Sequence, residues 1–362
     1  MNVVEMVRSI GWLHQTGGSG PYLSLAARMP GLGRAEVDAS VASGALRIVT
    51  GVRGCTLLVP ASDVGLARAA GARAFTGTLQ SLLHSGEIDA QTLDGVVNNV
   101  DAMLDFEGVD PATLRSRAGG IPALGPTGRQ LGFSTALPVA LRILESIDRS
   151  ERVPANGRLD SEAYLWRHPR DVDRGDGPPP GESVPADLFA LARAFFRWDG
   201  GAERTLADLA GWLDCPERAL QGLVARGRPH APFPNGPAYL PLGDPWLSLR
   251  SRNGDRVAPE HRAARVMGSG NETCPVGEVE SLHHHAIVAG GRIVGIWEWS
   301  RESGMVSGFF GEPPQGWEAA AGATRAFIED QLGDVYVHGR DGARPRAARM
   351  AAVQGCAVQR VL

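Results

Sequence analysis

The chain contains no lysine, so all 36 of its positively charged side chains are arginine. An arginine guanidinium is planar and always charged, which suits it to phosphate and carboxylate partners. Forty acidic residues leave a net charge of −4, which excludes the strongly basic balance of a general nucleic-acid binder. The 362 residues are 43% hydrophobic and 21% charged, as in ordinary soluble proteins of two or three domains.

Cysteine is also scarce, and its four residues lie far apart with no CxxC spacing. This excludes a zinc framework and a disulfide scaffold. No apolar run reaches about 18 residues, and the N-terminus has no basic start followed by a long apolar stretch. We therefore expect no membrane contact and a soluble, cytoplasmic protein.

Motifs for several enzyme classes are missing as well. No phosphate-binding loop, dinucleotide fingerprint, GxSxG or HExxH occurs in a confirming context, which disfavours nucleotide hydrolysis, Rossmann redox chemistry and metalloprotease action. The run His283-His284-His285 does not predict a metal site, because side chains on a strand alternate between faces. We expect neither a metal nor another cofactor.

The arginines are unevenly distributed along the chain. Residues 112–174 hold ten arginines against seven acids, and residues 225–266 hold seven against three. Residues 61–110 show the opposite balance, with two arginines against eight acids. Basic segments within an acidic whole permit a local phosphate-binding face.

The first sixty residues predict three short helices followed by a β-hairpin. Apolar spacing, Gly and Pro punctuation place the helices at 3–13, 21–29 and 34–43. Two β-rich runs, 45–52 and 55–59, are split by Arg53-Gly54, which indicates a hairpin turn. This order is typical of a winged helix, with the hairpin as its wing.

Two similar units and a β-rich region follow. A helix at 137–147 precedes a hairpin that turns at Asn156-Gly157, and helices at 187–198, 206–212 and 217–225 have helix-turn-helix spacing. Short β runs at 238–242, 286–288, 292–299 and 304–310 suggest a small barrel or sandwich, and a helix over 315–332 ends at Gly333.

The predicted fold class is therefore α+β, with tandem winged-helix units and a small C-terminal β-barrel. The expected domains are winged helix 1 (1–60), a helical insert (61–118), winged helix 2 (119–167), a linker (168–185), winged helix 3 (186–236) and a β-barrel with a C-terminal helix (237–362).

A family resemblance supports this organisation. The stretch HQTGGSGPYLSLAARMPGLGRAEVDASVASGALRIVTGVRGCTLLVPASD resembles the first winged-helix unit of the AlkZ/YcaQ-like DNA glycosylases. Similar blocks follow in the same order: LPVALRILES, RVPANGRLDSEAYLW, LARAFFRW, TLADLAGWL, YLPLGDPWLSLR and HAIVAGGRIVGIWEW. The resemblance covers most of the chain and implies tandem winged helices joined to a C-terminal β-barrel.

The resemblance also implies a reaction, the hydrolysis of the N-glycosidic bond of alkylated purines, such as N7-alkylguanine or crosslinks. The family uses a Gln-x-Gln or Gln-x-Asp pair after the first helix. Here the matching positions are His14 and Thr16, and Gln15 lies between them. In an extended segment His14 and Thr16 share one face, so His14 is a candidate base for a water that Thr16 fixes. Alternatively, His14 only caps a helix end and Thr16 bonds to nearby backbone.

Further candidate residues come from the same blocks. Asp244, before Pro245-Trp246, is a candidate to orient the water or stabilise the sugar cation, or else simply starts a turn. The candidate DNA-binding residues are Gln15, Arg53, Arg142, Arg152, Arg158 and Arg167. For Arg53, and likewise for the arginines around the second hairpin, the alternative is an exposed turn arginine with no DNA contact.

Three functional hypotheses follow. The first is a monofunctional, metal-free DNA glycosylase that acts as a monomer on double-stranded DNA carrying an alkylated purine. The second is a winged-helix DNA-binding protein without catalysis. The third is a relative that binds a small molecule or genotoxin on the same scaffold.

Overall fold

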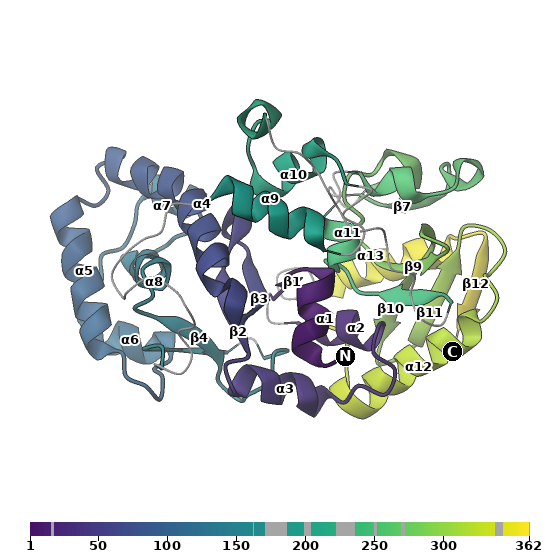
Figure 1. The fold of residues 1–362 in the computed structure, drawn as a ribbon, viewed down its shortest axis with the longest axis horizontal. Helices are drawn as coiled ribbons and strands as arrows, with labels where there is room; N and C mark the ends of the chain where they lie inside the picture. The colour runs from purple at the N-terminus through teal and green to yellow at the C-terminus, as the bar shows by residue number, and fades with distance from the viewer. Residues whose placement is uncertain are drawn as a thin grey trace.

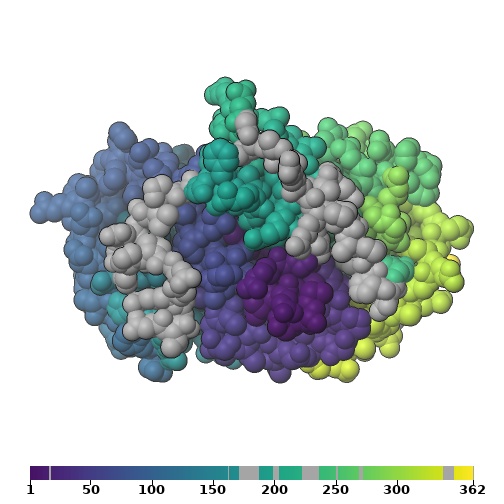
Figure 2. Space-filling view, in the orientation of Figure 1, coloured from purple at the N-terminus to yellow at the C-terminus, as the bar shows by residue number. Residues whose placement is uncertain are grey.

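The computed structural model describes residues 1–15, 18–161, 163–170, 187–198, 204–221, 236–249, 252–268, 272–336 and 343–361. The molecule is elongated, with a helix-rich first half at one end and a β-rich last third at the other (Figure 1). The N-terminal helices lie between these two parts, as the purple patch in the middle of Figure 2 shows. The segment that carries the predicted catalytic residues is therefore central in the molecule.

The N-terminal unit follows the predicted order. Its elements are α1 (Val3–Ile10), β1 (Leu13–His14), α2 (Gly20–Ala26), α3 (Arg34–Ala42), β2 (Leu46–Thr50) and β3 (Thr56–Pro60). Asn2 and Glu5 form a capping box that starts α1. The helix stops at Gly11, whose φ of 107° favours glycine and whose Cβ position lies 3.0 Å from the Trp198 ring. The chain then turns into β1, so the predicted helix at 3–13 ends three residues early.

Five helices and a second hairpin follow this unit. The helices are α4 (Val64–His84), α5 (Ala90–Met103), α6 (Pro111–Ala118), α7 (Pro126–Gln130) and α8 (Ala136–Ser146), and the hairpin strands are β4 (Glu151–Pro154) and β5 (Tyr164–Arg167). Both hairpins belong to one antiparallel sheet in the order β1-β3-β2-β4-β5, because β2 pairs with β4 at Ile48 and Arg152.

Both faces of this first sheet are covered. Leu13, Ile48 and Leu58 pack with α1, α2 and α3 on one face. Val49, Leu57 and Val59 pack on the other face with α4, α9 (Leu188–Arg197) and α10 (Leu206–Leu213). Every residue of β2 is consequently buried, so the first hairpin is part of a core and only its tip is exposed.

Three tryptophans attach α9 and α10 to the N-terminal segment. The Trp12 ring lies 5.3 Å from Trp198 and 5.6 Å from Trp212, and Trp198 and Trp212 are 5.5 Å apart. After α10, residues Glu217–Leu220 form a 3₁₀ turn where a helix over 217–225 was expected. Residues 222–225 and most of the predicted linker 168–185 lie outside the described residues.

The C-terminal third forms a second antiparallel sheet in the order β12-β11-β10-β9-β6. Its strands are β6 (Ala238–Leu240), β9 (His285–Ala289), β10 (Arg292–Ser300), β11 (Gly304–Phe309) and β12 (Val358–Val361). A separate hairpin, a short helix and two longer helices complete this region: β7 (Arg265–Met267) with β8 (Thr273–Pro275), α11 (Pro245–Ser248), α12 (Trp317–Phe327) and α13 (Ala343–Gln354).

This second sheet corrects one sequence expectation. Within the described residues β12 and β6 are its two edges and do not pair, so the sheet is open and not a closed barrel. Instead, a helix packs on each face of the sheet. Trp297 and Phe309 face α12 on one side, and Val306 packs with α13 residue Val353 on the other. Because both faces are buried in this way, the sheet needs no closure to form a core.

A buried cluster of charges joins the first sheet to α4 and α8. Glu145 accepts hydrogen bonds from Thr50 N (2.9 Å) and Thr50 Oγ1 (2.6 Å) and pairs with Arg152 at 3.1 Å. Arg68 pairs with Asp148 nearby. Burial by itself raises the pKa of Glu145, but the Arg152 cation and the Thr50 hydrogen bonds outweigh it and hold the pKa below 4.5.

We expect Glu145→Gln to destabilise the fold in a pH-dependent way. The depressed carboxyl pKa contributes stability that is present above about pH 4.5 and lost as the pH falls through the folded-state pKa. At pH 7 the substitution should cost about 3–5 kcal/mol, because it removes one partner from a buried ion pair. Urea unfolding from pH 7 down to pH 3 should show this difference shrinking. The exposed Glu329→Gln should cost under about 1 kcal/mol. A Glu145→Gln deficit that stays constant with pH would contradict the assignment.

Candidate active site and DNA-contact residues

His14 occupies β1, an edge strand of the first sheet. Leu13 pairs with Leu58 and His14 with Leu57 of β3, and Gln15 N donates to Thr56 O at 2.8 Å. The backbone here is extended, as expected, and His14 does not cap α1, which ended at Ile10. Its side chain is half-buried. Thr16 lies outside the described residues.

The loop 241–244 lies against His14. A Cβ at Gly243 would come within 3.7 Å of His14 Cβ, so the two residues are neighbours across 229 positions. Leu242 N donates to His285 Nδ1 at 2.8 Å, and the His285 ring stacks on Trp297 at 4.4 Å. Since this loop follows β6, the site lies where the edge of the first sheet meets the edge of the second.

Asp244 makes a bidentate ion pair with Arg28. Nη1 and Nη2 of Arg28 donate to Oδ2 and Oδ1 of Asp244, both at 2.8 Å, and Oδ1 also caps α11 through Trp246 N at 2.9 Å. The Asp244 side chain is 0% exposed and that of Arg28 is 8% exposed. The carboxylate therefore has two structural tasks and no free face toward solvent, which favours the turn-forming alternative for this residue.

Gln15 points away from His14 and is fully buried. Its Nε2 donates to Leu159 O and to the Tyr164 hydroxyl, the latter at 3.1 Å. A DNA contact would require this side chain to leave the core, so the geometry gives Gln15 an internal role in place of the predicted contact.

Arg53 is exposed at the tip of the first hairpin, in a 3₁₀ turn (Val52–Gly54) where its φ is 54°. Arg142 lies beside it, with Nη1 3.3 Å from the Cβ position of Gly54. The Arg142 guanidinium also lies over the rings of Phe75 (5.7 Å) and Phe133 (5.4 Å). Burial and the neighbouring Arg152 lower the Arg142 pKa. Arg142 thus lies against the turn whose tip carries Arg53.

The other three candidate arginines are engaged by acids. Arg152 and Arg167 have side chains 14% exposed and pair with Glu145 and Glu151 respectively. Arg158, on the second hairpin, is 34% exposed, and Asp160 accepts from its Nε at 2.8 Å. That hydrogen bond raises the Arg158 pKa. Arg158 is accessible to a phosphate, whereas Arg152 and Arg167 are largely buried against their acidic partners.

The chain matches the model of a known protein family over most of its length. The model of the family described as DNA glycosylase AlkZ-like matches residues 7–335, which is most of the chain. The chain belongs to the AlkZ-like DNA glycosylase family.

A solved structure shares the fold. Streptomyces sahachiroi DNA glycosylase AlkZ superimposes with a TM-score of 0.60 at 17% sequence identity, over 93% of this chain and 92% of that one. No curated protein matches the chain. At this identity the structural likeness shows the common fold, and the family assignment rests on the family match.

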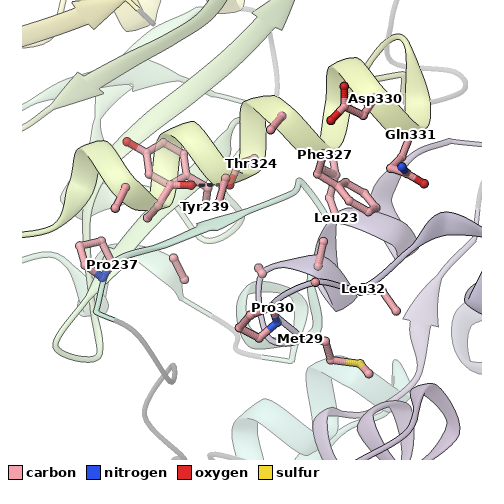
Figure 3. Close-up of a pocket in the computed structure, with 18 residues that line it drawn as sticks. Leu23, Met29, Pro30, Leu32, Pro237, Tyr239, Thr324, Phe327, Asp330 and Gln331 are labelled. Carbon is pink, nitrogen blue, oxygen red and sulfur yellow. Dashed lines mark hydrogen bonds between the residues drawn. The ribbon is translucent and has the colours of Figure 1, made fainter.

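The structure of this AlkZ-like chain contains a cavity away from the candidate site. A cavity of about 420 Å³ lies between α2, β6 and α12, lined by apolar side chains such as Leu23, Met29 and Phe327 (Figure 3). None of the predicted site residues lines it. Among the described residues no group of three potential ligands could hold a metal ion, and no helix is long and apolar enough to cross a membrane.

Sequence reasoning missed several residues that shape the AlkZ-like site. Arg28 meets Asp244 across 216 positions, and Leu159 meets Gln15 across 144. A basic residue near a helix end and a leucine in a hairpin carry no linear signature of these partners.

We expect Arg28→Met to destabilise the protein by about 3–5 kcal/mol, because it leaves the Asp244 carboxylate buried and unpaired. Urea unfolding at pH 7 measures the loss. Arg325→Met is a matched control, since its pair with Glu329 is exposed and should contribute well under about 1 kcal/mol. Equal effects of the two substitutions would show that the buried pair does not hold the loop.

Proposed function

We propose that this AlkZ-like protein hydrolyses the N-glycosidic bond of alkylated purines in double-stranded DNA, with N7-alkylguanine or an N7-linked crosslink as substrate. The family match over residues 7–335 carries this proposal. The extended strand that presents His14 beside the loop 241–244 supports it.

The leaving base of this substrate needs no activation by the enzyme. An N7-alkylated guanine already carries a positive charge, so it departs without protonation and without a Lewis acid. The site then has to hold a water and stabilise the sugar cation that forms. We therefore propose a monofunctional, metal-free reaction.

We assign His14 to the attacking water. The Gln-x-Gln or Gln-x-Asp pair of the family is replaced here by His14 and Thr16, and a neutral imidazole both accepts a proton and orients a water. Thr16 is proposed to fix that water through its hydroxyl. Because Arg28 and the α11 cap occupy its carboxylate, we assign Asp244 to positioning the loop that adjoins His14.

DNA binding is proposed to use the accessible arginines. Arg53, at the hairpin tip, and Arg158, on the second hairpin, are the candidates for phosphate contacts. Arg142 reinforces Arg53 from behind the turn. We assign Arg152 and Arg167 to holding the sheet that carries both hairpins.

The first test is release of 7-methylguanine from methylated duplex DNA in a buffer with chelator. We expect base release, and a fall of roughly ten- to ten-thousand-fold in its single-turnover rate with His14→Ala, as for loss of a general base. His14→Gln restores the family residue and should retain activity.

The outcomes of this assay separate the hypotheses. Release by the wild type with an unchanged rate in His14→Ala would overturn the role of His14 alone. Duplex binding without release from any alkylated substrate would instead favour the non-catalytic DNA-binding protein. Tight binding of a genotoxic small molecule in the absence of DNA would favour the third hypothesis.

A second test concerns Arg53. We expect Arg53→Gln to weaken duplex binding and to reduce the slope of log K against log salt by about 0.9, the value for one phosphate contact. Fluorescence anisotropy over a salt series measures this slope. Arg292→Gln removes an equally exposed arginine at the far sheet and should leave the slope unchanged. Identical slopes for the two variants would remove Arg53 from the interface.

A further inference from the structure

Gln15 is a polar residue between His14 and Thr16, the two candidate catalytic residues, yet its side chain faces the core. The strand alternates, so Trp12 and His14 point to one side of the sheet and Leu13 and Gln15 to the other. The side chain is 0% exposed and reaches across to the second hairpin region, where Nε2 donates to Leu159 O and to the Tyr164 hydroxyl.

The backbone at Leu159 is held from both sides. Its carbonyl accepts from Gln15, and its N–H donates to the Tyr22 hydroxyl at 2.8 Å. Tyr22 in turn donates to Asp38. Burial and the bond to Asp38 raise the Tyr22 pKa, so the phenol stays protonated and both bonds persist at neutral pH. The residue next to Arg158 is thus fixed to the segment that carries His14.

This arrangement costs stability at one atom. Gln15 Oε1 is buried without a hydrogen-bond partner among the described residues. An unsatisfied buried acceptor costs about 1–3 kcal/mol. An apolar side chain of similar length would remove this orphan oxygen but would leave the buried Leu159 carbonyl without its amide donor, so the two costs are similar. Stability alone therefore does not select the amide, and the position that it imposes explains it better.

We propose that Gln15 is a positioning residue that fixes the direction of His14 by tying β1 to the hairpin β4–β5. β3 pairs with one edge of β1, Gly243 lies against His14, and Trp12 and Leu13 pack on its two faces. The Gln15 tie adds the directional polar contact that limits rotation of β1 about its own axis. The inference rests on the proposed function, because it gives His14 the task assigned above.

The test compares Gln15→Met with Leu25→Met, a substitution at a fully buried position of the same core. Gln15→Met leaves the Leu159 carbonyl without its amide donor but also removes the unsatisfied amide oxygen, so one orphan acceptor replaces another and the urea midpoint should stay close to that of the control. We expect kcat for base release to fall roughly 10- to 100-fold, as for a small misplacement of a catalytic group. KM should change by no more than about twofold, because DNA contacts remain.

The Tyr164 hydroxyl is the second partner of the Gln15 amide and offers a second test. Tyr164→Phe removes one of the two amide partners and should give a smaller loss of kcat than Gln15→Met. Wild-type kcat in Gln15→Met, or an equal loss in Leu25→Met, would overturn the positioning role.

Hydrogen exchange distinguishes failure of this inference from failure of the proposed function. If the wild type releases no base from any alkylated substrate, the proposed function fails, and hydrogen exchange alone then tests whether Gln15 holds β1. Amides of Leu13–Gln15 and of residues 157–161 should then exchange faster in Gln15→Met than in Leu25→Met. Equal exchange in the two variants would show that the tie does not hold β1.

Discussion

The pairing of two residues, Leu13 and His14, with β3 is the constraint on which the candidate site depends. Such a short strand is stable only because its side chains are anchored on both faces: Trp12 in the tryptophan cluster, and Leu13 and Gln15 in the opposite core. The early end of α1 at Gly11 makes this strand possible. A helix continued to residue 13 would place these side chains 100° apart and not on alternate faces.

The site is also a junction between the two sheets. The loop after β6 reaches His14 at Gly243, and the bidentate pair of Arg28 with Asp244 holds that loop to the turn that follows α2. The residues that meet at the candidate site therefore come from parts of the chain more than two hundred positions apart.

Arginine serves two purposes in a chain without lysine. Within the cores its planar fork satisfies carboxylates that are buried by packing, as Arg152 does for Glu145 and Arg28 for Asp244. At the hairpin tip Arg53 is exposed to solvent. Within residues 112–174, Arg152 is largely buried against Glu145 whereas Arg158 is 34% exposed. The basic bias of this segment thus mixes structural and accessible charges, so a count of arginines does not by itself locate a DNA-binding face.

Local pattern alone determined much of the fold. Helix bounds near 34–43, 137–147 and 187–198 follow from apolar spacing and capping residues within a few positions, and the same holds for the strands around 292–310. An extended segment at His14 was a premise taken with its family position, whereas the predicted helix reached residue 13 and the strand β1 comes from the tertiary structure. Only the tertiary structure decided that the two hairpins share one sheet, that the C-terminal sheet stays open, that Gln15 is internal and that Asp244 is paired. Those outcomes depend on partners distant in sequence, and burial and pairing energies between such partners leave no periodic signal in the chain.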